Sequence, residues 1–132
     1  MTKALALLAT LAALLVGCGS DPSAGSTVAA PEFLQVAAEP GVTVVDVRTP
    51  EEYAAGHLAG SVNVDVEGPD FTAAIETLDP QGAYAVYCRS GRRSALAADA
   101  MADAGFARVT NLSGGLVDLQ SAGGQVVAGT QP

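Results

Sequence analysis

One cysteine of the chain stands among three arginines, in the segment Cys88-Arg89-Ser90-Gly91-Arg92-Arg93. The thiolate is the nucleophilic form of cysteine, and nearby cations or a helix N-terminus lower the thiol pKa from about 8.5. We therefore predict that Cys88 is an ionised nucleophile that solvent can reach. The anion-binding cradle beside it is predicted to consist of Arg89, Ser90, Gly91, Arg92 and Arg93. The alternative is a buried, inert cysteine that acts as a small hydrophobic side chain.

The elements around Cys88 are predicted to place it where a strand ends and a helix begins. Residues 83–87 form an apolar run typical of a buried strand, and residues 94–104 show helical periodicity. The thiol then lies at the positive end of the helix dipole, which favours a negative charge there. Gly91 allows the tight backbone curvature that such a loop requires.

The rest of the chain alternates between helical and strand patterns. Thr49-Pro50-Glu51-Glu52 has the form of a helix capping box. Helices are predicted at residues 31–38, 49–56, 69–78 and 114–120, and strands at 42–47, 61–64 and 107–112. This order predicts an α/β fold, a mostly parallel central sheet of about five strands with helices on both faces. In such sheets ligands bind beyond the carboxyl ends of the strands, where Cys88 is expected.

The N-terminus has the pattern of an export signal. Lys3 precedes an apolar run at residues 4–16 that ends in Leu15-Val16-Gly17-Cys18, which resembles a bacterial lipobox. We predict a signal peptide at 1–17, lipidation of Cys18, a flexible tether at 18–27 and one domain at 28–132. The protein would then be anchored at the extracytoplasmic face of the cell envelope. The alternatives are an ordinary signal peptide or an uncleaved anchor, with Cys18 incidental.

The charge balance limits the classes of partner. The chain has 6 basic and 14 acidic residues and a net charge of −8, which becomes −9 when Lys3 is removed with the signal peptide. This balance argues against nucleic acid or an anionic membrane as partner, so membrane contact is expected only through the N-terminal lipid. No residues have metal-ligand spacing, and we expect no metal, no other cofactor and a monomer.

Several motifs in this order resemble the single-domain rhodaneses, and the resemblance runs from about residue 28 to about residue 127. The motifs are Asp46-Val47-Arg48, residues 52–63 with Gly56-His57-Leu58, residues 87–94, Gly105-Phe106 and residues 112–115. The resemblance implies a three-layer rhodanese-like domain. One departure is that relatives commonly carry tryptophan a few residues after the Gly-Gly pair, whereas Leu119 stands nearby here.

The resemblance also implies a function. In that family the loop cysteine takes the outer sulfur of a donor such as thiosulfate as a persulfide and passes it to cyanide or a thiol. Cys88 would be this nucleophile. The export signal, rather than the resemblance, suggests an exported thioredoxin-like protein as partner. The alternative is a persulfide carrier or docking module without turnover. A phosphatase-like enzyme is disfavoured because that class has arginine six residues after the cysteine, where this chain has Ser94.

Other polar residues are predicted to support the loop. We expect Asp46 and Arg48 to buttress it or to pair with each other, with direct contact of Arg48 with the donor as an alternative. His57 is expected to pack and to hydrogen-bond a loop, with a role as general base as the alternative. Ser94 belongs to the same supporting set. Among the arginines, Arg89 and Arg92 are favoured as anion ligands, and Arg93 is either a third ligand or the partner of an acidic residue.

Overall fold

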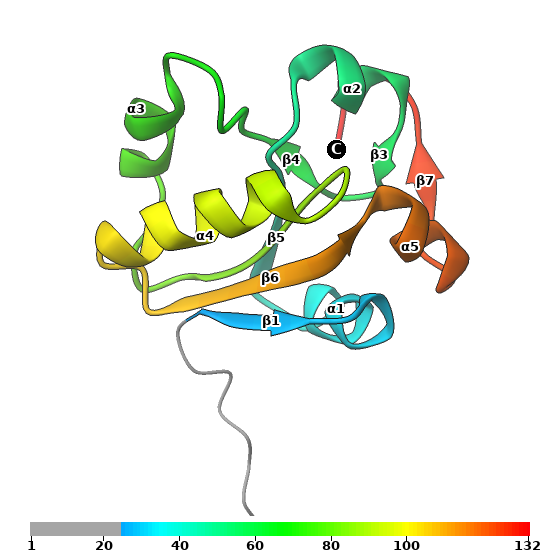
Figure 1. Ribbon diagram of the computed structural model, residues 1–132, viewed down its shortest axis with the longest axis horizontal. Helices are drawn as coiled ribbons and strands as arrows, with labels where there is room; N and C mark the ends of the chain where they lie inside the picture. The colour runs from blue at the N-terminus through cyan, green and yellow to red at the C-terminus, as the bar shows by residue number, and fades with distance from the viewer. Residues whose placement is uncertain (1–24) are drawn as a thin grey trace, which may run out of the picture.

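The computed structural model describes residues 25–132, which form a central sheet of five parallel strands (Figure 1). The strands are β1 Ser26–Val28, β2 Val42–Asp46, β4 Val62–Asn63, β5 Ala83–Cys88 and β6 Arg108–Gly115. Their order is β1-β6-β5-β2-β4, and each neighbouring pair is parallel. Strand β5, which ends at Cys88, is therefore the central strand of the sheet.

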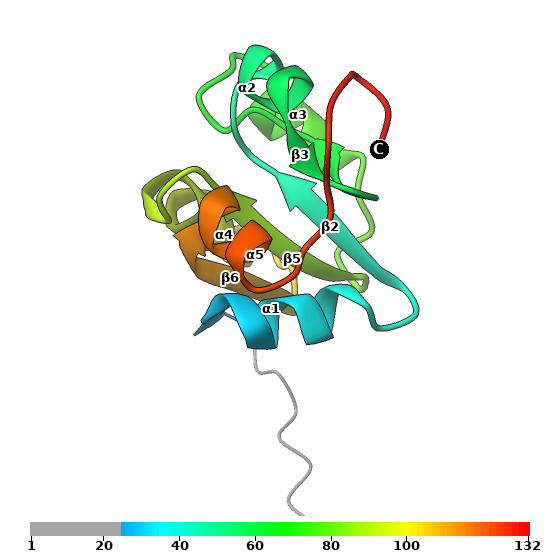
Figure 2. The same cartoon turned by 90° about the vertical axis from the view of Figure 1, so that its right-hand side faces the viewer.

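The helices cover both faces of this sheet, as predicted. They are α1 Ala30–Ala37, α2 Pro50–Ala55, α3 Phe71–Glu76, α4 Arg92–Asp103 and α5 Leu116–Ser121. Alternate residues of the central strands enter two different apolar clusters: Val86 packs with α3 and α4, and Ala85 packs with α1 and α5. Figures 1 and 2 show α1 and α4 separated by β5 and β6.

Helix α2 begins at a capping box, as its sequence predicts. The Thr49 Oγ1 atom accepts the Glu52 N–H at 3.2 Å, and Glu52 Oε2 accepts the Thr49 N–H at 3.1 Å. These bonds satisfy two N–H groups that the first turn of a helix leaves without a backbone acceptor. The box fixes where α2 starts, and Glu52 of this box binds Arg93 in the first turn of α4.

The structure differs from the sequence prediction in its shortest elements and in some boundaries. Strand β1 pairs with β6 although it begins at Ser26, inside the predicted tether. Strand β3 His57–Leu58 pairs antiparallel with β7 Val126–Val127, and neither was predicted. Segments of two or three residues are too short to show a periodic pattern. Helix α4 starts at Arg92 rather than at residue 94, so Arg92 and Arg93 belong to its first turn.

Leu119 fills the position near which relatives commonly carry tryptophan. Its side chain is fully buried and packs in the same apolar cluster as Phe33 and Leu112. The predicted signal peptide, the lipidation site Cys18 and most of the tether lie outside the described residues. Within residues 25–132, none of the helices has both the length and the apolar character that crossing a membrane requires.

Candidate active site

The sulfur of Cys88 lies inside the loop that joins β5 to α4. The Gly91 backbone N–H donates a hydrogen bond to Cys88 Sγ at 3.0 Å. Cys88 Sγ donates to Ser94 Oγ at 3.5 Å, and Ser94 Oγ in turn donates to the Gly91 carbonyl oxygen at 3.2 Å. Gly91 is the residue before α4 and has a φ of 94°, a conformation that glycine adopts without strain. The turn thus aims backbone N–H groups at the sulfur.

The Cys88 side chain is buried, which differs from the prediction of a sulfur that solvent reaches. Its residue exposure is 0%. The reason is the alternation along β5, because Cys88 follows Tyr84 and Val86 on the face that α4 covers. The sulfur is nevertheless surrounded by hydrogen-bond donors, so it is not the inert hydrophobic side chain of the alternative interpretation.

Two opposing effects set the Cys88 pKa. Burial raises the pKa of the thiol, but hydrogen bonds to the sulfur lower it by more, and the net pKa is below its usual value. The hydrogen-bond partners of the sulfur are the Ser94 hydroxyl and the backbone N–H groups of Ser94, Ser90 and Gly91. The site therefore favours a thiolate through dipoles of the loop and of the first turn of α4.

The loop rests on the end of β6 with no space for side chains between them. A Cβ atom at Gly115 would collide with the carbonyl oxygen of Arg89, and a Cβ atom at Gly91 would lie 2.6 Å from the carbonyl oxygen of Ser113. Such distances are far below normal contact, so glycine is required at both positions. The Gly-Gly pair at the end of β6 therefore has a direct structural role in shaping the Cys88 loop.

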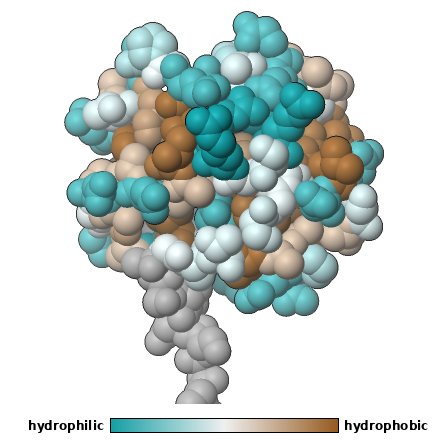
Figure 3. Space-filling model, viewed as in Figure 1, coloured by the Kyte–Doolittle hydropathy of each residue, from teal (hydrophilic) through white to brown (hydrophobic). Residues whose placement is uncertain are grey.

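The three loop arginines have different environments. Arg89 and Arg92 are exposed, and neither forms an ion pair with any acidic residue of 25–132. Arg93 is only partly exposed, and its guanidinium is bound to Glu52. Figure 3 shows strongly hydrophilic side chains gathered over the start of α4 and the loop before it. Two cations thus remain available for an anion beside the Cys88 loop.

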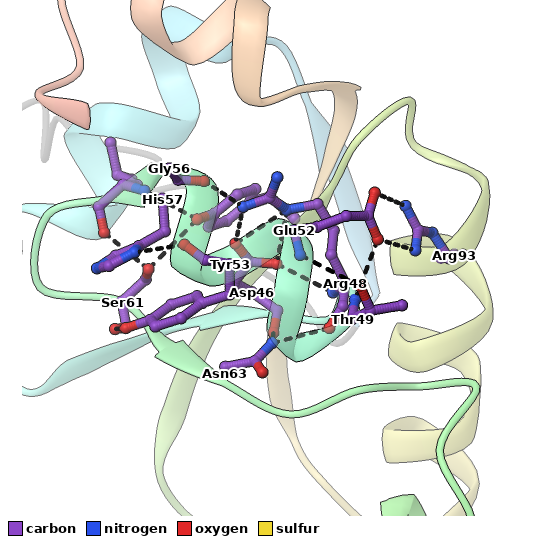
Figure 4. Close-up of polar contacts among 12 residues, drawn as sticks. Asp46, Arg48, Thr49, Glu52, Tyr53, Gly56, His57, Ser61, Asn63 and Arg93 are labelled. Carbon is purple, nitrogen blue, oxygen red and sulfur yellow. Dashed lines mark hydrogen bonds and ion pairs between the residues drawn. The ribbon is translucent and has the colours of Figure 1, made fainter. Parts of the chain in front are cut away.

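Arg93 forms an ion pair with Glu52. Pairing with an acidic residue is the second of the two roles that the sequence left open for Arg93. Its Nη1 donates to Glu52 Oε2 at 2.7 Å, and its Nη2 donates to Oε1 at 2.9 Å (Figure 4). The Arg93 hydrogen bonds, ahead of other causes, lower the pKa of Glu52 to about 2. The sequence marked Glu52 only as a capping residue, and no local spacing signals its contact with a residue 41 positions later.

Asp46 and Arg48 pair with each other beneath α2. Arg48 Nε donates to Asp46 Oδ1 at 2.9 Å, and Arg48 Nη2 donates to Asp46 Oδ2 at 2.6 Å (Figure 4). The same Nη2 donates to the carbonyl oxygen of Gly56 at 2.6 Å, which ties the end of α2 to β2. Arg48 is 5% exposed, so its guanidinium serves this internal network rather than the solvent side of the loop.

His57 is buried against α2. Its ring stacks on Tyr53 with a centroid separation of 3.7 Å, and its Nδ1 lies 2.9 Å from the Tyr53 carbonyl oxygen. Its Nε2 has no hydrogen-bond partner among residues 25–132. The contacts of His57 are thus with α2 and not with the Cys88 sulfur, which matches the packing interpretation. In the same described range no three His, Cys, Asp or Glu side chains are grouped to hold a metal ion.

The fold and the site together define a small α/β domain whose central strand ends at a buried cysteine and continues into a loop that carries arginines. The model of the rhodanese-like domain family matches residues 29–122. The chain belongs to this family.

Two curated relatives carry the name thiosulfate sulfurtransferase. Thiosulfate sulfurtransferase GlpE of Pseudomonas fluorescens (strain SBW25) is 40% identical over 86 residues, which cover 64% of this chain and 76% of the relative. Thiosulfate sulfurtransferase PspE of Escherichia coli (strain K12) is 33% identical over 75 residues, covering 57% of this chain and 71% of the relative.

Solved structures share the fold. A crystal structure of the Alr3790 protein from Anabaena sp. aligns with a TM-score of 0.68 and 26% identity, over 79% of this chain and 80% of that one. A structure described as a rhodanese with anions from E. coli aligns with a TM-score of 0.54 and 30% identity, over 67% of this chain and 99% of that one.

Proposed function

We propose that this protein is a sulfurtransferase that moves sulfane sulfur from thiosulfate through a persulfide on Cys88. The observation that carries the proposal is the buried sulfur of Cys88, which accepts the Gly91 N–H at 3.0 Å beside the exposed Arg89 and Arg92. Relatives named thiosulfate sulfurtransferase support the same activity. A solved structure described as a rhodanese with anions supports an anionic ligand for this chain.

In the first step the Cys88 thiolate attacks the outer sulfur of thiosulfate. A bond forms between Cys88 Sγ and that sulfur, the S–S bond of thiosulfate breaks, and its electron pair leaves with sulfite. Arg89 and Arg92 hold the sulfonate oxygens by charge-assisted hydrogen bonds. The N–H groups of the loop stabilise the negative persulfide that results.

In the second step an acceptor removes the outer sulfur. Cyanide or a thiolate attacks it, the persulfide S–S bond breaks, and the electron pair returns to Cys88 as thiolate. The products are thiocyanate or a persulfide on the acceptor. The two half-reactions balance without any further oxidant or reductant, and they predict ping-pong kinetics.

Access to the buried sulfur requires a local opening of the loop. Arg89 and Ser90 face solvent, whereas Cys88 and Ser94 lie in the interior. The donor reaches the sulfur when the outer part of the loop moves and the first turn of α4 stays in place. Loops open in this way at small cost in free energy compared with global unfolding.

The activity is tested with the purified full chain in detergent. Thiosulfate should add the mass of one sulfur atom at Cys88, and cyanide should remove it with catalytic formation of thiocyanate. A stable adduct that only a partner protein discharges would indicate the carrier without turnover. No adduct with any sulfane donor would refute both sulfur functions.

We propose that the protein acts in the cell envelope, where a lipid on Cys18 anchors the domain. A thioredoxin-like protein or a small thiol would then accept the sulfur from the Cys88 persulfide. The lipobox pattern and the single remaining thiol, Cys88, support this arrangement. Fatty-acid labelling of the native chain and of Cys18→Ser in bacterial cells tests it. Label in the native chain alone is expected, and absence of label in both would contradict the anchor.

A further inference from the structure

The carboxylate of Glu52 connects two helices. Its Oε2 accepts the Thr49 N–H of the α2 capping box at 3.1 Å and Arg93 Nη1 at 2.7 Å. Its Oε1 accepts Arg93 Nη2 at 2.9 Å (Figure 4). The side chains of Arg93 and Glu52 are only 17% and 29% exposed. A two-bond, partly buried pair of this kind fixes geometry as well as charge.

Arg93 is the residue directly before Ser94 in the first turn of α4. The Ser94 hydroxyl and its backbone N–H both act on the Cys88 sulfur, as does the N–H of Gly91. A restraint on Arg93 is therefore a restraint on the donors that surround the sulfur. Because Glu52 is itself held by the α2 capping box, the restraint originates in a different helix.

We propose that Glu52 and Arg93 are positioning residues for Cys88, whose ion pair fixes the first turn of α4 so that its hydrogen-bond donors stay on the sulfur. The inference rests on the proposed function for its kinetic part only. It also assigns the loop arginines different tasks: Arg93 positions the turn, and Arg89 and Arg92 are left to bind the donor.

The ion pair between Glu52 and Arg93 persists over the pH range in which the thiolate exists, so it does not act as a pH switch. The hydrogen bonds from Arg93, ahead of other causes, hold the Glu52 pKa near 2, and the hydrogen bond to Glu52 is the main cause of the raised Arg93 pKa. The negative charge of Cys88 also contributes to the raised Arg93 pKa. Both partners are therefore ionised whenever the thiolate is present.

The test compares three variants of the full chain. Glu52→Gln keeps an oxygen that can accept the Thr49 N–H, since glutamine also completes a capping box, but it removes the ion pair with Arg93. Glu67→Gln removes the same charge from the other acidic neighbour of Arg93, 3.6 Å away and exposed. Thr49→Ala weakens the α2 cap and leaves the Glu52 carboxylate in place.

Two readouts are measured for each variant. The first is the pH midpoint of Cys88 alkylation by iodoacetamide, which needs no sulfur transfer and so remains informative if the proposed function fails. The second is kcat and KM with thiosulfate and cyanide. Glu52→Gln should raise the alkylation midpoint by roughly half a unit or more and lower kcat about 10- to 100-fold. KM for thiosulfate should change less than about twofold, since uniform binding is retained.

The control variants distinguish a specific effect of Glu52 on the first turn of α4 from a general loosening of the structure. Glu67→Gln should leave the alkylation midpoint and kcat near the native values. Thr49→Ala should change both by less than Glu52→Gln, because the backbone N–H of residue 49 can still donate to the Glu52 carboxylate. An unchanged midpoint and kcat in Glu52→Gln, or equal changes in Thr49→Ala, would overturn the inference. If Glu52→Gln does not fold, Arg93→Ala and Arg93→Lys replace it, because lysine keeps a charge for Glu52. Partial return of the midpoint in Arg93→Lys supports positioning, and its equality with Arg93→Ala contradicts it.

Discussion

The backbone N–H of Gly91 lies 3.0 Å from the sulfur of Cys88 and points at it from the turn before α4. This contact links a local feature of the chain, a glycine with positive φ, to the chemistry of a residue three positions earlier. The main chain itself thus supplies a hydrogen bond to the sulfur. Arg89 and Arg92 remain available to bind the sulfur-donor molecule.

The Cys88 pKa should lie below that of an ordinary thiol. Burial raises it, but the hydrogen bonds from Ser94, Ser90 and Gly91 lower it by more. The pH dependence of iodoacetamide alkylation should therefore have its midpoint below about 8.5. Burial slows alkylation at every pH without moving this midpoint, provided the loop opens faster than it reacts. A midpoint at or above that of a free thiol would contradict the role given to the loop.

Gly91→Ala should destabilise the domain and slow alkylation of Cys88. The φ of 94° strains any residue with a Cβ, and this Cβ would lie 2.6 Å from the Ser113 carbonyl oxygen. We expect a loss of about 2–4 kcal/mol in the free energy of unfolding. Gly105→Ala is the matched control, because Gly105 has a φ of 91° but no atom within 4 Å of the added Cβ. Equal losses in the two variants would show that the contact with β6 has no effect.

Arg89→Ala and Arg92→Ala should each raise KM for thiosulfate. A charge-assisted hydrogen bond contributes about 1.5–3 kcal/mol, so a rise of about tenfold or more is expected for each. Arg108→Ala removes the same charge from the opposite end of β6, where Arg108 bonds the Gln81 carbonyl oxygen, and should leave KM unchanged. Equal KM values for thiosulfate in all three variants would show that Arg89 and Arg92 do not bind the anion.

Stability should fall in acid partly through Glu52. Its pKa is lowered from 4.5 to about 2 in the folded protein, mainly by the hydrogen bonds from Arg93. A group with a depressed folded pKa stabilises the fold above its unfolded pKa, and this contribution is lost as pH falls towards 2. With allowance for solvent screening we expect about 1 kcal/mol. Urea unfolding of native and Glu52→Gln chains should show a stability gap near pH 7 that closes by pH 2.

The local patterns of the sequence predicted much of this fold, because each depends on neighbouring residues. The apolar run before Cys88 predicts a buried strand, and Thr49 with Glu52 predicts the start of α2; both are present. Strands β3 and β7 were not predictable in this way, because each gains its structure from pairing with the other across a long stretch of chain. The same holds for β1 and its pairing with β6.

The candidate site, like the fold, could be predicted from the sequence only in part. The sequence placed the thiol, the glycine turn and the arginines in one loop because they are consecutive. The burial of Cys88 and the contact between Glu52 and Arg93 depend on how α2 and α4 pack, which no local pattern contains. The sequence left the role of Arg93 open for the same reason, since charge alone does not say which acid an arginine meets.

The most direct test of the central claim is the mass of the intact protein after incubation with thiosulfate. The account predicts a gain of one sulfur atom that maps to Cys88, disappears with cyanide and is absent in Cys88→Ser. An unmodified native chain, or the same gain in Cys88→Ser, would contradict it.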